Sequence, residues 1–174
     1  MQFSTGQIVV HPHHGPATVS AIITRTIKQS PVPYLQLKIH RSDLMVAVPV
    51  GKAEEIGLRN VYDPSELAEL FAILHAPTEH EEQTWSRRFK SNREKLNVGD
   101  LHVTAAVVRD LTRREHLKGL SAGEKGMLKT AYSSVLAELS LGMSLSDEQA
   151  EELLESAILS SEPTLEERRL AAAG

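Results

Sequence analysis

The spacing of the hydrophobic residues changes about a third of the way along the chain. Up to residue 50, apolar and polar residues alternate in segments 18–27 and 34–39, as they do on the two faces of a strand, and we expect a last short strand at residues 44–50. From residue 64 onward, apolar residues instead recur every three or four positions, as on one face of a helix. We therefore expect an α+β protein in which a strand-rich module precedes an all-helical one, with the break between residues 51 and 62.

The strand-rich module is expected to be a small, strongly bent β-barrel. Its strands are rich in β-branched residues, and tight turns separate them, beginning with HPHHGPA (residues 11–17) after QIVV (residues 7–10). Several such strands within about fifty residues favour a barrel. In segment 18–27 we expect four apolar residues to share one face: Val19, Ala21, Ile23 and Ile27.

Start signals divide the helical part into separate helices. Asp63 precedes a proline at a first helical position, and Asp100 can cap a helix that Gly119 ends. Two further starts have capping-box spacing, Ser121 with Glu124 and Ser146 with Gln149. The expected helices cover about residues 64–76, 84–96, 101–118, 121–141 and 146–159. We expect domains at residues 1–55 and 56–160, followed by a frayed or disordered Glu- and Ala-rich tail at residues 161–174.

Composition excludes several classes of protein. The chain is 41% hydrophobic and 24% charged, as is usual for a soluble globular protein. It has no cysteine, which excludes disulfides, thiol catalysis and thiolate metal sites and fits a reducing cytoplasm. The start MQFSTGQIVV does not resemble a secretory signal, and no apolar run approaches the roughly 20 residues that span a bilayer.

Positive charge is concentrated in one stretch. Between Trp85 and Lys129 there are eleven Lys or Arg and five Asp or Glu, a net charge of +6, whereas the whole chain carries −4 and the remainder therefore −10. A basic face on an acidic protein is typical of nucleic-acid binding. A solvated helical face can show the same excess by chance, and charge alone leaves both interpretations open.

The only tryptophan of the chain begins this basic stretch, in TWSRRFKSNREKL (residues 84–96). On a helix, Trp85 and Phe89 lie roughly on one side. They could both pack inward, with the cations facing water. Alternatively, Trp85 could stay partly exposed as a wedge, an apolar side chain that inserts at a DNA base step, while neighbouring cations contact phosphates. The residues alone leave both alternatives open.

A metal site and an enzymatic function have little support. Three histidines in HPHHG (residues 11–15) could ligate a metal, but no Asp, Glu or Cys lies nearby in sequence to complete the site. The chain contains no HExxH, P-loop, GxGxxG or GxSxG motif. We therefore expect no catalytic residue, no metal and no cofactor, and a metal- or ligand-binding regulator remains only as an alternative function.

Several motifs, in this order and spacing, resemble the CarD family of bacterial transcription regulators over the chain up to about residue 160. They are VVHPHHGPA (9–17), ITRTIK (23–28), YLQLKI (34–39), TWSRRFKSNREKL (84–96), VVRDL (107–111) and GLSAGEKGML (119–128). The resemblance implies an N-terminal Tudor-like barrel, similar to a module of the transcription-repair coupling factor, that binds the β subunit of RNA polymerase. It implies a helical domain that binds promoter DNA at the upstream edge of the transcription bubble, without sequence specificity.

The resemblance also implies roles for particular residues. Trp85 would wedge into the minor groove and stabilise the open complex, with cations such as Arg87 and Lys90 on the backbone. The expected DNA-binding residues are Trp85, Arg87, Arg88, Lys90, Arg114 and Lys125. The expected polymerase-binding residues are Arg25, Thr26, Val46, Ala47 and Val48.

One position departs from the family pattern. Where the family carries a second polymerase-binding arginine, this chain has Ala47, and a methyl group cannot make the bidentate contacts of a guanidinium. Either the polymerase partner differs, the contact is weaker, or another residue compensates. Separately, if Trp85 is packed inside, an alternative function is a polymerase-binding adaptor that lacks a strong DNA contact. In either case we expect a monomeric cytoplasmic protein that does not bind membranes.

Overall fold

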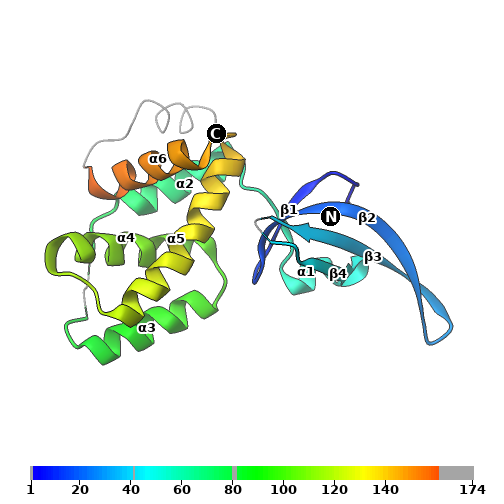
Figure 1. The fold of residues 1–174 in the computed structure, drawn as a ribbon, viewed down its shortest axis with the longest axis horizontal. Helices are drawn as coiled ribbons and strands as arrows, with labels where there is room; N and C mark the ends of the chain where they lie inside the picture. Colours follow the sequence, from blue (N-terminus) through cyan, green and yellow to red (C-terminus); the bar gives the residue numbers. More distant parts are fainter. Residues whose placement is uncertain (1, 41, 80–81, 161–174) are drawn as a thin grey trace. The chain divides into compact units, whose positions relative to one another are not determined.

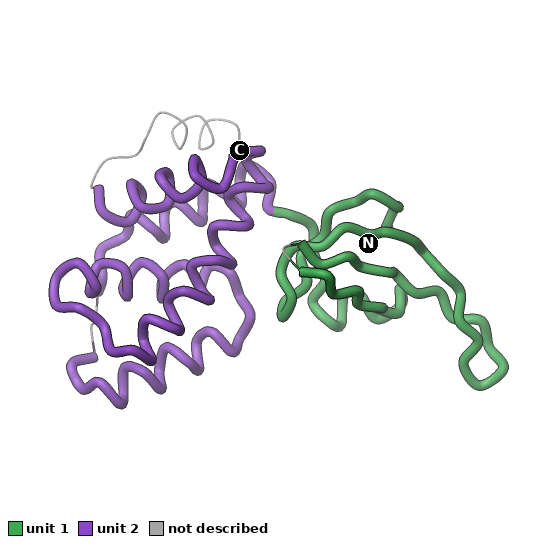
Figure 2. Tube along the Cα trace, viewed as in Figure 1, with its two compact units in different colours: residues 1–61 green, residues 62–174 purple. Residues whose placement is uncertain are grey.

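The computed structural model describes residues 2–40, 42–79 and 82–160. The chain divides into two compact units, residues 1–61 and residues 62–174, which we call the strand unit and the helical unit (Figure 2). Residues 56–61, which the sequence analysis placed in the helical domain, group with the strand unit. The expected tail, residues 161–174, lies outside the described residues.

The strand unit is an antiparallel five-stranded sheet with the order β4-β3-β2-β1-β5 (Figure 1). A short 3-10 helix and α1 connect β4 to β5. Among the described residues, β4 and β5 each pair on one side only, so the expected barrel is not closed. The two-residue strand β5 pairs only with β1 and is too short to complete a barrel. The elements are β1 (Ile8–His11), β2 (Gly15–Ile27), β3 (Ser30–Ile39), β4 (Met45–Pro49), η1 (Val50–Lys52), α1 (Ala53–Ile56) and β5 (Arg59–Asn60).

A β-bulge at Ser20 decides which side chains of β2 face the core. Val19 pairs with the buried Leu37, but the next pair joins Ala21 to Gln36, so Ser20 is skipped. Because one extra residue reverses the alternation, Val19 faces the core and Ala21 the opposite surface. The expectation that these two residues share a face is therefore wrong. The buried core of the unit consists of Val9, Ala17, Val19, Leu35, Leu37, Ile39, Val48, Ala53 and Leu58.

The helical unit contains α2 (Pro64–His75), α3 (Trp85–Asn97), α4 (Leu101–Lys118), α5 (Ala122–Gly142) and α6 (Asp147–Leu159). Side-chain caps at Asp63, Asp100, Ser121 and Ser146 accept hydrogen bonds from first-turn amides of α2, α4, α5 and α6. These caps satisfy backbone donors that a helix leaves unpaired, which explains why the expected boundaries are confirmed to within a few residues. None of the described helices is long and apolar enough to cross a membrane.

The core of the helical unit forms between α2, α4, α5 and α6. Leu70, Val108, Val135 and Leu154, one from each helix, are completely buried in it. Helix α3 packs against α4 and α5, on the side of the unit away from α2 and α6 (Figure 1). The buried residues of α3 are polar, Arg88 and Asn92, so polar contacts contribute much of its attachment.

Candidate functional site

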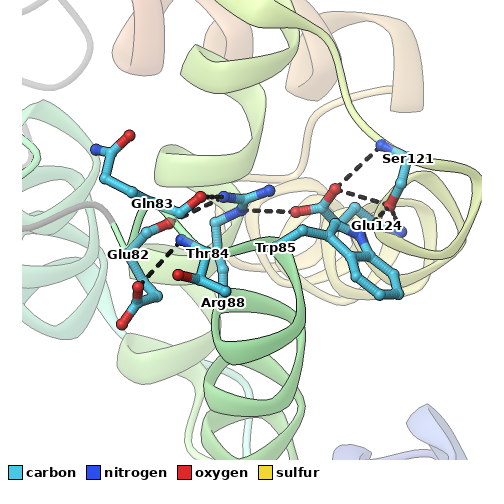
Figure 3. Close-up of polar contacts among 7 residues, drawn as sticks. All are labelled: Glu82, Gln83, Thr84, Trp85, Arg88, Ser121 and Glu124. Carbon is cyan, nitrogen blue, oxygen red and sulfur yellow. Dashed lines mark hydrogen bonds and ion pairs between the residues drawn. The ribbon is translucent and has the colours of Figure 1, made fainter.

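Trp85 is the first residue of α3, and 52% of it is exposed. Its ring stacks against Phe89 one turn later, with centroids 5.9 Å apart and an angle of 27° between the ring planes. The indole Nε1 donates a hydrogen bond to Ser121 Oγ at 2.8 Å, across to the N-cap of α5 (Figure 3). The alternative in which Trp85 packs inward is therefore wrong. The indole is exposed on α3 but held in place by contacts within the unit.

Ser121 uses its whole hydrogen-bonding capacity. Its hydroxyl accepts from the indole of Trp85 and from the backbone amide of Glu124, and it donates to Glu124 Oε2 at 2.7 Å. A hydroxyl has one proton to give and two lone pairs that accept, so these contacts are compatible with one another. Ser121 thus caps α5 and binds the tryptophan at the same time.

Glu124 connects Ser121 to α3. It is 1% exposed, and its Oε1 accepts from Arg88 Nε at 2.7 Å, while its Oε2 accepts from the backbone amide of Ser121 at 3.0 Å. Burial by itself raises the pKa of the Glu124 carboxyl, but hydrogen bonds from Arg88 and Ser121 stabilise the charged form. The pKa therefore lies below its ordinary value, and the carboxylate is ionised near neutral pH.

The structure corrects the expected role of Arg88. This residue is 6% exposed, and its guanidinium binds Glu124 and donates to the carbonyl of Glu82 at 2.9 Å (Figure 3). A phosphate contact requires an accessible guanidinium. We therefore remove Arg88 from the DNA-binding residues. It holds α3 to α5 and fixes the backbone that leads into Trp85.

The other expected DNA-binding cations differ in exposure. Arg87 is exposed, and Lys90 is exposed with a long ion pair to Glu94, 3.9 Å between Nζ and Oε1. Lys125, also exposed, pairs with Glu115 at 3.0 Å, and Arg114 is half-buried. Exposed ion pairs are worth about 0–1 kcal/mol, so phosphates could compete for both lysines. Arg87 and Lys90 share α3 with Trp85, whereas Arg114 and Lys125 lie on α4 and α5.

The expected polymerase-binding residues fall on both faces of the sheet. Val48 is 2% exposed and Val46 packs against the core, so neither side chain points toward a partner. Arg25 and Thr26 are exposed on β2. The Arg25 guanidinium lies 5.1 Å from the centroid of the Tyr34 ring, a cation–π contact.

Ala47 lies on the face of the sheet opposite the core. It is half-buried and pairs with Gln36, which in turn pairs with Ala21. We call this surface, made by Ala21, Ile23, Arg25, Tyr34, Gln36 and Ala47, the outer face. On β4 the side chain of Ala47 belongs to this surface, whereas Val46 and Val48 can offer a partner only their main chain at the sheet edge.

The three histidines of HPHHG form a turn. His11 is buried, its Nδ1 accepts from the backbone amide of His13 at 3.2 Å, and its ring centroid lies 4.7 Å from that of His14. Burial, followed by His14 and His13, lowers the pKa of His11, which favours the neutral ring. The described part of the chain contains no group of three His, Cys, Asp or Glu side chains placed to hold a metal ion.

Sequence reasoning did not include Ser121, Glu124 and Phe89 among the site residues. The capping-box spacing of Ser121 and Glu124 was visible, but only as a helix start. Their contacts to α3 join residues 36 positions apart, and a local sequence pattern does not predict a contact over that separation. Phe89 was recognised only as a helical neighbour of Trp85.

Comparisons with known proteins agree with this two-unit architecture. Residues 3–62 match the CarD-like/TRCF RID domain, and residues 69–155 match the family described as CarD, C-terminal domain. The chain is 29% identical over 147 residues to "Putative transcription factor YdeB" of Bacillus subtilis (strain 168), a match that covers 84% of this chain and 96% of that relative. Together these matches define a transcription regulator whose first unit implies an interaction with RNA polymerase. The chain belongs to the CarD family.

Proposed function

We propose that this protein binds the β subunit of RNA polymerase through the strand unit and stabilises the open promoter complex through the helical unit. Trp85 inserts into the minor groove at the upstream edge of the bubble and holds the partly unstacked base step. The protein acts as a monomer in the bacterial cytoplasm. It contacts promoter DNA without reading its sequence.

The observation that carries this proposal is the exposure of Trp85 within a cationic helix. Trp85 presents a large apolar ring, 52% exposed, next to exposed cations on the same helix. Its one polar group already bonds to Ser121, so the remaining surface that it offers is apolar. Unstacking a base step costs roughly a few kcal/mol, and an inserted apolar ring offsets part of that cost.

The cations on the same helix supply the rest of the interaction. Arg87 and Lys90 lie two and five positions after Trp85 and are exposed. Each phosphate that they neutralise releases counterions, which favours binding at any sequence. Arg114 and Lys125 are proposed as further phosphate contacts, the first with less of its side chain accessible. Few contacts of this kind give weak affinity for free duplex.

The strand unit supplies the missing affinity by tethering the helical unit to polymerase. The proposed contacts are the side chains of Arg25 and Thr26, the small surface at Ala47, and the main chain of β4 at Val46 and Val48. Tethering raises the local concentration of Trp85 at one position on the promoter. An added stabilisation of only about 1.4 kcal/mol would then shift the open-complex equilibrium tenfold.

The test is the lifetime of open complexes formed by the cognate polymerase on a promoter. At a protein concentration that just saturates the wild-type effect, we expect the wild-type protein to prolong the lifetime, and both Trp85→Ala and Arg25→Glu to lose most of the effect. Val98→Ala, which shortens a 70% exposed side chain after the end of α3, is the matched control and should behave as wild type. If Trp85→Ala keeps full activity while Arg25→Glu loses it, the protein is a polymerase-binding adaptor without a functional DNA contact.

A further inference from the structure

The exposed indole of Trp85 is held by contacts that reach it from two directions. Its ring stacks on Phe89, and its Nε1 bonds to Ser121 at the start of α5. From the other direction, Arg88 binds the carbonyls of Glu82 and Gln83 at 2.9 and 3.4 Å, in the segment that leads into α3. Both the side chain of Trp85 and the chain before it are therefore fixed.

These two sets of contacts meet at Glu124. One carboxylate oxygen of Glu124 binds Arg88, and the other binds both the hydroxyl and the amide of Ser121 (Figure 3). Because Arg88 and Glu124 are buried, they do not readily exchange their partners for solvent, and Ser121 is partly buried. The contacts form one continuous chain from the backbone before Trp85 to the edge of its indole.

The start of α5 also fits closely against Phe89. A Cβ atom added at Gly123 would lie 3.1 Å from Phe89 Cε2, so this first turn approaches the ring more closely than a residue with a side chain usually does. Phe89 in turn is the stacking partner of Trp85. The same turn of α5 therefore limits the indole both through Ser121 and through Phe89.

We propose that Ser121 and Glu124, together with Arg88, are positioning residues that pre-order the exposed Trp85 indole for insertion into DNA. The proposal rests on the proposed function and concerns how its wedge is prepared. Immobilising a mobile side chain on binding costs a factor of roughly two to ten in the equilibrium constant. An indole that is already ordered avoids that loss. None of the three positioning residues has to touch DNA.

The first test uses the fact that Trp85 is the only tryptophan, so intrinsic fluorescence reports on this side chain alone. In Ser121→Ala, we expect a larger fast component in the time-resolved anisotropy and easier quenching by acrylamide. Ser121→Thr keeps a hydroxyl and a helix cap and should restore the wild-type signal. Unchanged indole motion in Ser121→Ala would overturn the proposal.

Loss of a helix cap needs its own control, because Ser121→Ala also weakens the start of α5. Ser146→Ala removes an equivalent capping box from α6. Since no contact in the described structure joins Ser146 to Trp85, this variant should be destabilised to a similar extent with no change in the indole signal. If Ser146→Ala mobilises the indole as much as Ser121→Ala does, general loosening of the unit explains the effect and the proposal is wrong.

The second test measures open-complex lifetime in a double-mutant cycle with the full chain and cognate polymerase. Ser121→Ala should shorten the lifetime about fivefold, the usual worth of one hydrogen bond. In a Trp85→Phe background, which keeps a ring but has no N–H, Ser121→Ala should have at most a twofold further effect. Equal shortening in both backgrounds would mean that Ser121 acts independently of the indole, which overturns the proposal.

The failure of the two proposals can be told apart. If Trp85→Ala leaves the lifetime unchanged, the wedge itself is wrong, and positioning for insertion falls with it. If Trp85→Ala abolishes the effect but Ser121→Ala keeps the wild-type lifetime while mobilising the indole, the wedge stands and pre-ordering has no role. Trp85→Phe is a change at an exposed position. The loss of the α5 cap in Ser121→Ala is common to both backgrounds, so its effect cancels in the cycle.

Discussion

Arg87 and Arg88 are neighbours in sequence but lie in different surroundings. Arg88 is buried against Glu124, and Arg87 is exposed to solvent. Removing one partner of a buried ion pair leaves the other charge uncompensated, so Arg88→Ala should lower the free energy of unfolding by about 3–5 kcal/mol. Arg87→Ala should change it by less than about 0.5 kcal/mol and instead shorten open-complex lifetime. Urea unfolding and the lifetime assay together check this pair. Similar stability losses in the two variants would contradict the assignment.

The different roles of these two arginines could not be predicted from the sequence. Both stand in a run of cations, and both were expected to contact DNA. Burial of Arg88 depends on Glu124, 36 positions away, and on how α3 packs against α5. Trp85 shows the same limit, since its helix was predicted from local pattern but its contact with Ser121 was not.

Glu124 makes the helical unit sensitive to acid. Its pKa is lowered in the folded protein from the ordinary value of 4.5, so the folded state holds its proton less tightly than the unfolded state does. The stability that it contributes is complete above the unfolded pKa and is lost as the pH falls through the folded pKa. The difference in unfolding free energy between wild type and Glu124→Gln should therefore be largest near neutral pH and should shrink on acidification.

Urea unfolding from about pH 7 to about pH 3 measures this difference, and taking the difference cancels the groups that the two proteins share. Glu94→Gln, at an exposed position on α3, is the control and should remain close to wild type throughout. A gap between wild type and Glu124→Gln that stays constant over this range would show that the folded-state pKa is not lowered.

At the scale of elements, Arg113 joins the ends of two helices. Its guanidinium donates to the carbonyls of Leu74 and Ala76, at the end of α2, and to that of Ile158, at the end of α6. The last carbonyls of a helix have no partner within the helix, and a nearby cation also interacts favourably with the helix dipole. Arg113→Met keeps much of the side-chain volume but leaves these acceptors unpaired, and should cost at least about 2 kcal/mol of stability.

Thermal unfolding followed by circular dichroism tests this role of Arg113. Arg93→Met makes the same substitution at an exposed position of α3 and should leave the melting temperature nearly unchanged. If the two variants have the same melting temperature, water satisfies the carbonyls that Arg113 binds equally well. The contacts of Arg113 with α2 and α6 then contribute little to stability.

Elements with local start signals were predicted well, and elements that depend on pairing were not. The N-caps at Asp63, Ser121 and Ser146 lie within three residues of their partners, so the helix starts can be read directly. The faces of β2 depend on the bulge at Ser20, which is defined only by the register with β3. The barrel would close only if β5 paired with β4 at the opposite edge of the sheet. The alternation of apolar and polar residues does not indicate whether two strands pair.

At the scale of the whole molecule, the two units have separate tasks in the proposed function. Arg25 belongs to the unit that tethers, and Trp85 to the unit that inserts. Weakening the tether lowers the fraction of polymerase that has this protein bound, but a bound molecule still inserts its indole normally. Weakening the wedge leaves binding through the tether intact and removes the effect of each bound molecule on the open complex. The two kinds of variant should therefore respond differently to protein concentration.

We expect Arg25→Glu to raise the concentration that gives half of the maximal open-complex lifetime by tenfold or more, with the maximum itself retained, since about 1.4 kcal/mol of lost binding is enough. Trp85→Ala should instead show a reduced maximum that no concentration restores. Lys52→Glu reverses an exposed charge elsewhere in the strand unit and should titrate as wild type. A reduced maximum in Arg25→Glu would mean that the outer face also shapes the open complex, and the division of labour between tether and wedge would then be wrong.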